Sequence, residues 1–293
     1  MLWIVYSLAC ALAEALKDVA SRKALNSCSR LTMATAVPLF SIPIFIWVSI
    51  ESKSAIPSFD DLWQAAPLLF LDSALHIVAM FLYMDALAAA PLAQTLPLVS
   101  LTPLFMLVTS PLINREYASS GGALGVVMIV AGAYIANIRS ELSGLAAPIL
   151  ALATNPGSRS MLGVAFIWAI TGNLDRVGMQ YVSLPVWLLL LLVIMSICLC
   201  GLLYGKGLLG EIYSRNHFIP LFLAGIFGAL SLFLYMKGIE LANISYVVAV
   251  KRTSILMGIL LGFIYLRERP RKLQLVGAFV MVAGVFVFAL LRD

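Results

Sequence analysis

The chain has 293 residues, of which 62% are hydrophobic and 11% are charged, and its mean hydropathy is +1.02. A water-soluble domain does not carry this much apolar surface, so the composition excludes a soluble globular protein and indicates a membrane protein. The formal net charge of +5 comes mostly from Lys and Arg in predicted loops and does not indicate a nucleic-acid-binding surface.

Ten apolar segments are each long enough to cross the hydrocarbon core of a bilayer as a helix, which takes about 20 residues. They are 2–21, 31–50, 66–85, 92–113, 119–138, 161–180, 184–204, 218–237, 243–266 and 272–291. Barrel strands would instead alternate apolar and polar residues over about ten positions. We therefore expect an all-α membrane protein with ten transmembrane helices.

The first segment carries Glu14, Lys17 and Asp18 on one helical face, which we expect to be turned to the protein interior. Glu14 is a candidate functional residue, and Lys17 with Asp18 is predicted to form a structural ion pair. At an offset of 158, Asp175 and Arg176 in the sixth segment repeat that pair with the charges reversed. They are predicted to serve the same structural purpose, as an ion pair between helices.

The third segment places Asp72 and His76 four residues apart, and hence on one helical face. A histidine beside a carboxylate is suited to relay protons near neutral pH. A hydrogen-bonded packing role is more common for a lone histidine inside a membrane, and we favour it here. The spacing of the Cys, His, Asp and Glu residues predicts no metal site, and no cofactor is expected.

Two stretches of the chain, 82–116 and 234–268, align without a gap at an offset of 152. Only the second copy carries adjacent cations inside its apolar run, Lys251 and Arg252, and Ser100 stands where Arg252 does. Buried cations cost several kcal/mol unless they meet water, a counter-charge such as Glu240, or an anionic ligand. The segment that contains Ser100 also carries three prolines, Pro97, Pro103 and Pro111, and Pro91 directly precedes it; these prolines predict kinks beside a cavity.

The predicted substrate site therefore lies between the fourth and ninth segments. Its candidate residues are Lys251, Arg252, Tyr83, Gln94, Tyr235, Asn243 and Tyr246. Among these, Arg252 offers bidentate hydrogen bonding to phosphate or carboxylate.

The repeat divides the chain into residues 1–138, an interfacial linker at 139–160, and residues 161–293. Each unit has five helices, so two tandem units must enter the membrane from opposite sides. Basic residues in equivalent loops are distributed unequally, as an inverted repeat requires. The same loop charges, by the positive-inside rule, place both termini outside the cytoplasm.

Both halves resemble the EamA domain of the drug/metabolite transporter superfamily. The resemblance rests on ten helices in a five-plus-five repeat, on Arg-Glu at the ends of the fourth and ninth segments, and on the Ala-Gly patterns of the fifth and tenth. It implies a carrier of small solutes with both termini in the cytoplasm, opposite to the loop charges, and both orientations stay open. The sequence VVAVKRTSI is similar to the Lys-Arg pair of plastid sugar-phosphate translocators, which implies anion binding by Lys251 and Arg252.

A second local resemblance leads to a different substrate. The sequence LACALAEAL is similar to the first helix of small multidrug resistance proteins, which implies proton coupling at Glu14. The expected function is secondary transport of a small anionic or zwitterionic metabolite by alternating access, as an exporter or exchanger. Proton-coupled efflux of cationic compounds and flipping of a lipid carrier remain alternatives.

The partners we expect are a small-molecule substrate, the lipid bilayer, and a proton or counter-substrate; a homodimer is compatible with the sequence. The hydrolase and P-loop motifs that we looked for do not occur, so the chain is not expected to be an enzyme. The expected location is a bacterial inner (cytoplasmic) membrane, as a multi-pass protein.

Overall fold

The computed structural model describes residues 2–25, 27–52, 57–89, 98–137, 155–215, 217–254, 256–257, 261 and 272–290. Their regular secondary structure is helical throughout these ranges. The helices are α1 (Leu2–Leu25), α2 (Arg30–Glu51), α3 (Phe59–Ala89), α5 (Thr102–Ile113), α6 (Ser120–Asn137), α8 (Pro156–Gly178), α9 (Leu184–Gly205), η1 (Leu209–Tyr213), α10 (Phe218–Leu241), α11 (Ile244–Lys251) and α13 (Lys272–Leu290). Each of the ten predicted segments contains an α-helix, so the expectation of an all-helical chain is confirmed.

Polar caps set the start of several helices. Ser29 precedes α2 and accepts a hydrogen bond from the Thr32 backbone N–H. Asn155 precedes α8 in the same way, with Pro156 at the first helical position. This cap starts α8 five residues before the predicted 161, so the last part of the predicted linker is helical, while 139–154 lies outside the described residues.

Among the described residues, four helices are long and apolar enough to cross a membrane: Arg30–Glu51, Phe59–Tyr83, Leu184–Gly205 and Phe218–Leu241. The molecule exposes large apolar side chains such as Trp47, Ile50 and Leu112, which are 64%, 70% and 78% exposed. Acidic side chains, such as those of Asp72 and Asp175, are buried in its interior. An apolar exterior around a polar interior is the arrangement that a bilayer favours.

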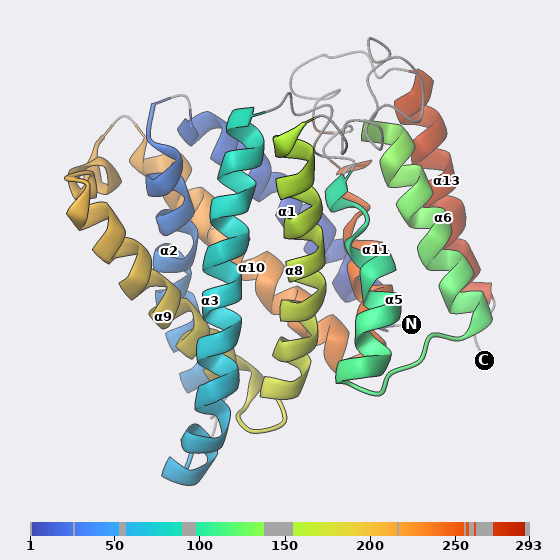
Figure 1. Cartoon of the computed structure of the whole chain (residues 1–293), viewed down its shortest axis with the longest axis horizontal. Coiled ribbons are helices and arrows are strands. Elements are labelled where there is room, and N and C mark those ends of the chain that lie inside the picture. The colour runs from blue at the N-terminus through green and yellow to red at the C-terminus, as the bar shows by residue number, and fades with distance from the viewer. Residues whose placement is uncertain are drawn as a thin grey trace.

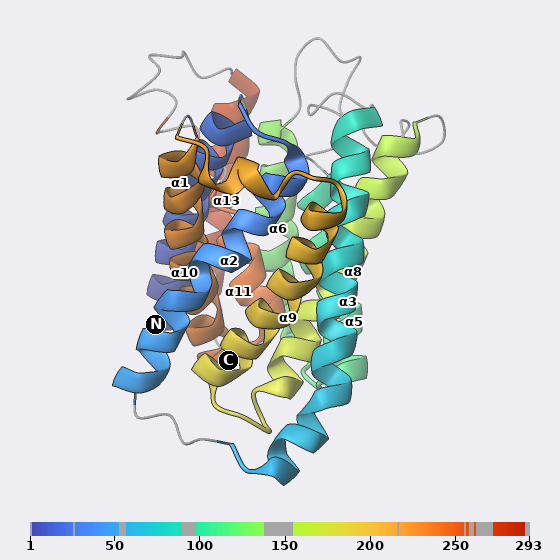
Figure 2. The same ribbon diagram turned by 90° about the vertical axis from the view of Figure 1, so that its left-hand side faces the viewer.

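Figures 1 and 2 show helices from the two halves interleaved in one bundle, with α2 and α9 at one end and α6 and α13 at the other. By chain order, α1, α2, α3, α5 and α6 correspond to α8, α9, α10, α11 and α13. Corresponding helices exchange partners, so that each contact between the halves occurs twice. α1 packs on α10, and its counterpart α8 packs on α3. In the same way α1 packs on α11, and α8 packs on α5. In addition, three helices of each half pack on their own counterparts, in the pairs α2–α9, α5–α11 and α6–α13.

The predicted segments 92–113 and 243–266 are both interrupted. α5 begins only at Thr102, and α11 ends at Lys251, followed by a turn at Arg252 and Thr253. At both breaks a threonine hydroxyl donates to the carbonyl three residues back: Thr102 to Val99 and Thr253 to Val250, each at 2.7 Å. Such bonds compete with the helical ladder, and Pro103 removes a donor from the first turn of α5. The prolines of the fourth segment predicted an interruption there, whereas the break after α11 was not predicted.

Glycines let α6 and α13 approach closely. A Cβ at Gly284 would lie 3.0 Å from the backbone nitrogen of Ile129, and a Cβ at Gly132 would lie 2.6 Å from the backbone oxygen of Gly277. Backbone atoms cannot move aside as a flexible side chain can. These two helices can therefore lie this close only because glycine, which has no side chain, occupies the contact positions.

Substitution of Gly284 by valine is expected to lower the free energy of unfolding by about 1–3 kcal/mol, because the new methyl groups push α6 and α13 apart. The measurement is thermal unfolding of the purified protein in detergent. Gly201→Val in α9 is the control, because no atom lies within 4 Å of a Cβ at that position. Equal melting temperatures for both variants would show that the contact carries no stability.

The α9–α10 connection is tied to the start of α2. Glu211 in η1 accepts hydrogen bonds from the Thr32 hydroxyl at 2.7 Å and the Ser29 backbone N–H at 2.9 Å. These bonds, that from Thr32 first, hold the pKa of Glu211 below its ordinary value of 4.5. The carboxylate therefore stabilises the fold above pH 4.5, and this contribution is lost as the pH falls through the lowered pKa.

We expect Glu211→Gln to lower the free energy of unfolding by about 1 kcal/mol at neutral pH. We also expect the stability of the variant to fall less steeply than that of wild type as the pH is lowered. The measurement is melting temperature against pH for wild type and variant. The two curves should converge below pH 4.5, where the wild-type carboxylate takes up its proton. Glu51→Gln, at an exposed carboxylate that ends α2, should run parallel to wild type. Curves for Glu211→Gln and wild type that stay equally far apart at every pH would contradict this linkage.

Candidate functional site

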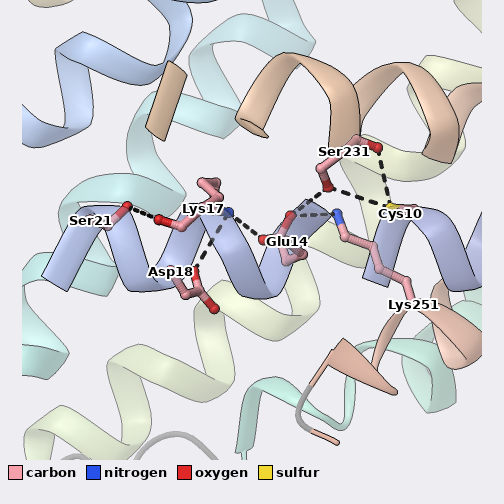
Figure 3. A network of polar contacts seen from close by, with 7 residues as sticks. All are labelled: Cys10, Glu14, Lys17, Asp18, Ser21, Ser231 and Lys251. Carbon is pink, nitrogen blue, oxygen red and sulfur yellow. Dashed lines mark hydrogen bonds and ion pairs between the residues drawn. The ribbon is translucent and has the colours of Figure 1, made fainter. Parts of the chain in front are cut away.

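A network of polar side chains connects the two halves of the bundle at α1, α10 and α11 (Figure 3). The Glu14 carboxylate on α1 forms an ion pair with Lys17 one turn along and accepts a 2.6 Å hydrogen bond from Ser231 on α10. Its Oε2 also lies 3.6 Å from Lys251 Nζ on α11. Cys10 donates to the Ser231 carbonyl from one turn before Glu14. The Glu14 carboxylate therefore links three helices, α1, α10 and α11, through ion pairs and a hydrogen bond.

Lys251 has two partners in this network. Besides Glu14, its ammonium lies 5.2 Å from the centroid of the Tyr235 ring, a cation–π contact with a buried side chain of α10. Glu240, the counter-charge considered from the sequence, instead pairs with Lys237 one turn away at 2.9 Å. The carboxylate that neutralises Lys251 thus comes from the other half of the chain.

Arg252 caps the C-terminal end of α11 at the helix break. Its Nη2 donates to the Thr102 hydroxyl at 2.9 Å, across the interface with α5. Its Nε is buried and has no hydrogen-bond partner among the described residues. Because Thr102 begins α5, the guanidinium faces a helix N-terminus, which carries partial positive charge of its own. Two positive groups thus face one another across this interface.

Other candidate residues have structural partners. Asn243 caps α11 by accepting from the Ser245 N–H at 3.0 Å. Tyr246 accepts from the Ser119 N–H at 2.8 Å and lies against Gly122, which ties α11 to the start of α6. These contacts give both side chains a packing role that their sequence context did not reveal.

Tyr83 is near enough to Lys17 to interact with it electrostatically, but its ring packs elsewhere. It stacks on Trp168 of α8 with ring centroids 6.1 Å apart, inside a separate apolar cluster. Gln94 lies outside the described residues. Of the seven candidate substrate residues, the structure therefore gathers Lys251, Arg252 and Tyr235 with Glu14.

The predicted reversed ion pair differs in its partners. Lys17 lies 3.9 Å from Asp18 but pairs more closely with Glu14, and Arg176 pairs with Glu116 at 2.9 Å. Asp175 has no Lys or Arg within 4 Å in the described part of the chain and accepts instead from Trp187 Nε1 at 3.0 Å. Successive helical residues point in different directions, so Asp175 and Arg176 reach different neighbours. The prediction of a structural ion pair at Asp175 was wrong.

A second cluster lies between α3 and α8. Asp72, His76 and Asp175 offer oxygen and nitrogen atoms that all lie within 4.8 Å of one another. Sequence reasoning found the Asp72–His76 spacing but missed Asp175 as its neighbour. It also missed Ser231, Thr102 and Trp187, because a single Ser, Thr or Trp in an apolar helix gives no signal of its own.

The first network holds more positive than negative charge. Lys17, Lys251 and Arg252 are three cations, and Glu14 with Asp18 supplies two carboxylates. Asp18 is 60% exposed, so its charge is screened more and acts more weakly on the cations than that of Glu14. Among the described residues this leaves an excess of at least one positive charge, and the buried Nε–H of Arg252 has no hydrogen-bond acceptor there.

Comparisons with known proteins agree with the helical architecture. Residues 1–138 and 156–290 each match the sequence profile of the EamA-like transporter family. An uncharacterized transporter of Archaeoglobus fulgidus is 24% identical over 298 aligned positions, which cover 99% of this chain and 96% of the relative. A protein known from a crystal structure superposes with a TM-score of 0.76 at 16% identity, covering 99% of this chain and 96% of that one. This structural likeness concerns the fold alone.

Proposed function

Because this chain belongs to the EamA-like transporter family, we propose that it is a secondary transporter of a small anionic or zwitterionic metabolite. It is an integral membrane protein, and its family supports a carrier rather than an enzyme. The direction that we propose is export or exchange, coupled to a proton or counter-substrate. The proposed location is the bacterial inner membrane.

The architecture that we propose is ten membrane spans in two inverted five-helix repeats. The exchange of packing partners between corresponding helices supports a two-fold relation between the halves. The family matches at 1–138 and 156–290 support two copies of one unit. The boundaries that we propose are 1–138 for the first unit, 139–160 for the linker and 161–293 for the second unit. Breaks in α5 and α11 support alternating access, since carriers of this type bind substrate where half-helices end near the membrane midplane.

One observation carries the choice of substrate class: the buried Nε of Arg252, left without a hydrogen-bond partner among the described residues. A buried, unsatisfied donor on a cation costs free energy that a bound phosphate or carboxylate would recover. Thr102 and the N-terminus of α5 would complete the surroundings of the anion. Glu14, by contrast, is already occupied by two lysines, which weakens the case for a cationic substrate there.

The test is ligand-dependent thermal stabilisation of the purified full-length chain. The probes are inorganic phosphate, a sugar phosphate, a dicarboxylate, a zwitterionic amino acid, a quaternary ammonium compound and a short polyprenyl phosphate. A ligand at about 100 times its dissociation constant stabilises by roughly 2.7 kcal/mol. We expect anions or the zwitterion to stabilise wild type and Lys237→Gln, and Arg252→Gln to abolish the effect.

Each other outcome assigns a different substrate. Stabilisation by the quaternary ammonium compound alone, lost in Glu14→Gln, would replace this proposal with proton-coupled efflux. Stabilisation by the polyprenyl phosphate but not by water-soluble phosphates would indicate a lipid-carrier flippase. Anion binding that survives Arg252→Gln would place the site elsewhere in the bundle.

A further inference from the structure

The acidic cluster between α3 and α8 is deeply buried. The side chain of Asp72 is 0% exposed, and Asp175 is 3% exposed as a residue. The two helices come from different halves of the chain and pack along their length (Figures 1 and 2). The cluster thus lies at an interface between the two halves, like the network around Glu14 but with the opposite charge.

The hydrogen bonding of this cluster is incomplete. Neither oxygen of Asp72 has a hydrogen-bond partner in the described part of the chain. The nearest base is His76, whose Nε2 lies 3.8 Å from Asp72 Oδ1, beyond hydrogen-bond distance. Within the same described ranges, Asp175 accepts from one donor, Trp187 Nε1. A fully buried carboxylate without a donor is therefore held beside a second carboxylate.

Two neighbouring carboxylates cannot both stay ionised in such surroundings without a cation between them. The groups that act on the pair from the helices around it are His76 on α3, Lys251 on α11 and Tyr235 on α10. Lys251 is already paired with Glu14, and Tyr235 carries no positive charge. The negative charge of the cluster is thus only partly balanced by the protein.

The geometry favours a proton over a metal ion. A proton needs only two oxygens, one to hold it and one to accept its hydrogen bond. Divalent metals take four to eight ligands, and this cluster offers three side chains among apolar neighbours. His76 is 25% exposed and is the least buried member, so it is placed to exchange protons with the outside of the cluster.

We propose that Asp72 and Asp175 bind a single proton between them and exchange it through His76. In the uptake step, a protonated His76 first turns so that its Nε2 comes from 3.8 Å to hydrogen-bond distance of Asp72 Oδ1. The Nε2–H bond then breaks, an O–H bond forms at Asp72 Oδ1, and the imidazole returns to neutral. The second carboxylate accepts the new hydrogen bond. This site is separate from Glu14 and does not depend on the substrate proposed above, although a carrier that has it would hold its coupling ion at the contact between its halves.

The test is infrared difference spectroscopy of the full-length chain in lipid nanodiscs, titrated in H2O and D2O. Wild type should show the carbonyl stretch of one protonated carboxylic acid at neutral pH, where ordinary carboxyl groups are ionised. Asp72→Asn and Asp175→Asn should each remove this band completely. Glu240→Gln, which breaks only the outer pair with Lys237, should leave it unchanged.

A third variant separates a proton-binding role from a merely structural one. Trp187→Phe keeps most of the ring but removes the N–H that stabilises ionised Asp175, so the band should titrate at higher pH than in wild type. It also provides a result should either asparagine variant fail to fold.

Three results would overturn the proposal. The first is that wild type lacks the band at neutral pH, and the second is that the band persists in both asparagine variants. The third is that wild type purified without chelators holds one tightly bound divalent metal per chain and that Asp72→Asn does not. None of these measurements uses a substrate, so they do not depend on whether Arg252 binds an anion.

Discussion

Replacement of Glu14 by glutamine is expected to lower the free energy of unfolding by about 3–5 kcal/mol, the usual cost of breaking a buried ion pair from one side. The variant leaves Lys17 and Lys251 without the carboxylate between them, and it offers a single oxygen where Lys17 and Ser231 each had an acceptor of their own. The measurement is unfolding of the protein in mixed detergent micelles as the fraction of denaturing detergent rises.

A double variant tests the cause of this loss. Glu14→Gln with Lys251→Gln removes one of the stranded cations, so it should be more stable than Glu14→Gln alone. Glu240→Gln provides the matched control, because it breaks an ion pair of the same spacing as Glu14–Lys17 at the outside of the protein, where about 0–1 kcal/mol is expected. A Glu14→Gln protein as stable as wild type would mean that the folded state does not rely on an ionised Glu14.

Replacement of Trp187 by alanine is expected to destabilise the protein by about 3–5 kcal/mol as well. The indole is completely buried at the start of α9, and its ring occupies the space that a side chain at Gly178 would need. Truncation leaves a cavity against α8 and deprives Asp175 of its hydrogen-bond donor. Denaturant unfolding with intrinsic fluorescence of the remaining tryptophans measures the effect.

Trp47→Ala is the natural comparison for this truncation. Trp47 lies on α2 and is 64% exposed, so its removal opens no internal cavity and should cost little. A similar loss of stability for both substitutions would mean that the energy comes from contact with the lipid or detergent rather than from internal packing.

The helices could be predicted from the sequence, because long apolar runs and their caps are local properties. The breaks could be predicted only in part. Pro103 marks the first, but the second depends on the hydroxyl of Thr253 bonding back to Val250, which many threonines inside helices do without ending them. The starts of α2 and α8 follow from Ser29 and Asn155, whose capping role is readable from sequence.

The site was harder to predict, because its contacts join residues far apart in the chain. The sequence shows that Lys251 needs a counter-charge, yet nothing local points to Glu14 rather than Glu240. Asp72 and Asp175 meet only because particular faces of α3 and α8 come together. Asn243 and Tyr246 were candidates by position alone, and local hydrogen bonds to the backbone explain them instead.

The exchange of partners between corresponding helices has a consequence for how this protein could have arisen. Two identical subunits related by a dyad must carry the same side chain at both equivalent places. Once both units are encoded in one polypeptide, each place can mutate alone: Lys17 and Asp175 occupy corresponding positions and carry opposite charges. In the inverted repeat proposed above, covalent fusion allows a cationic and an anionic locus at equivalent places of the two halves, an electrical polarity that two identical subunits could not have.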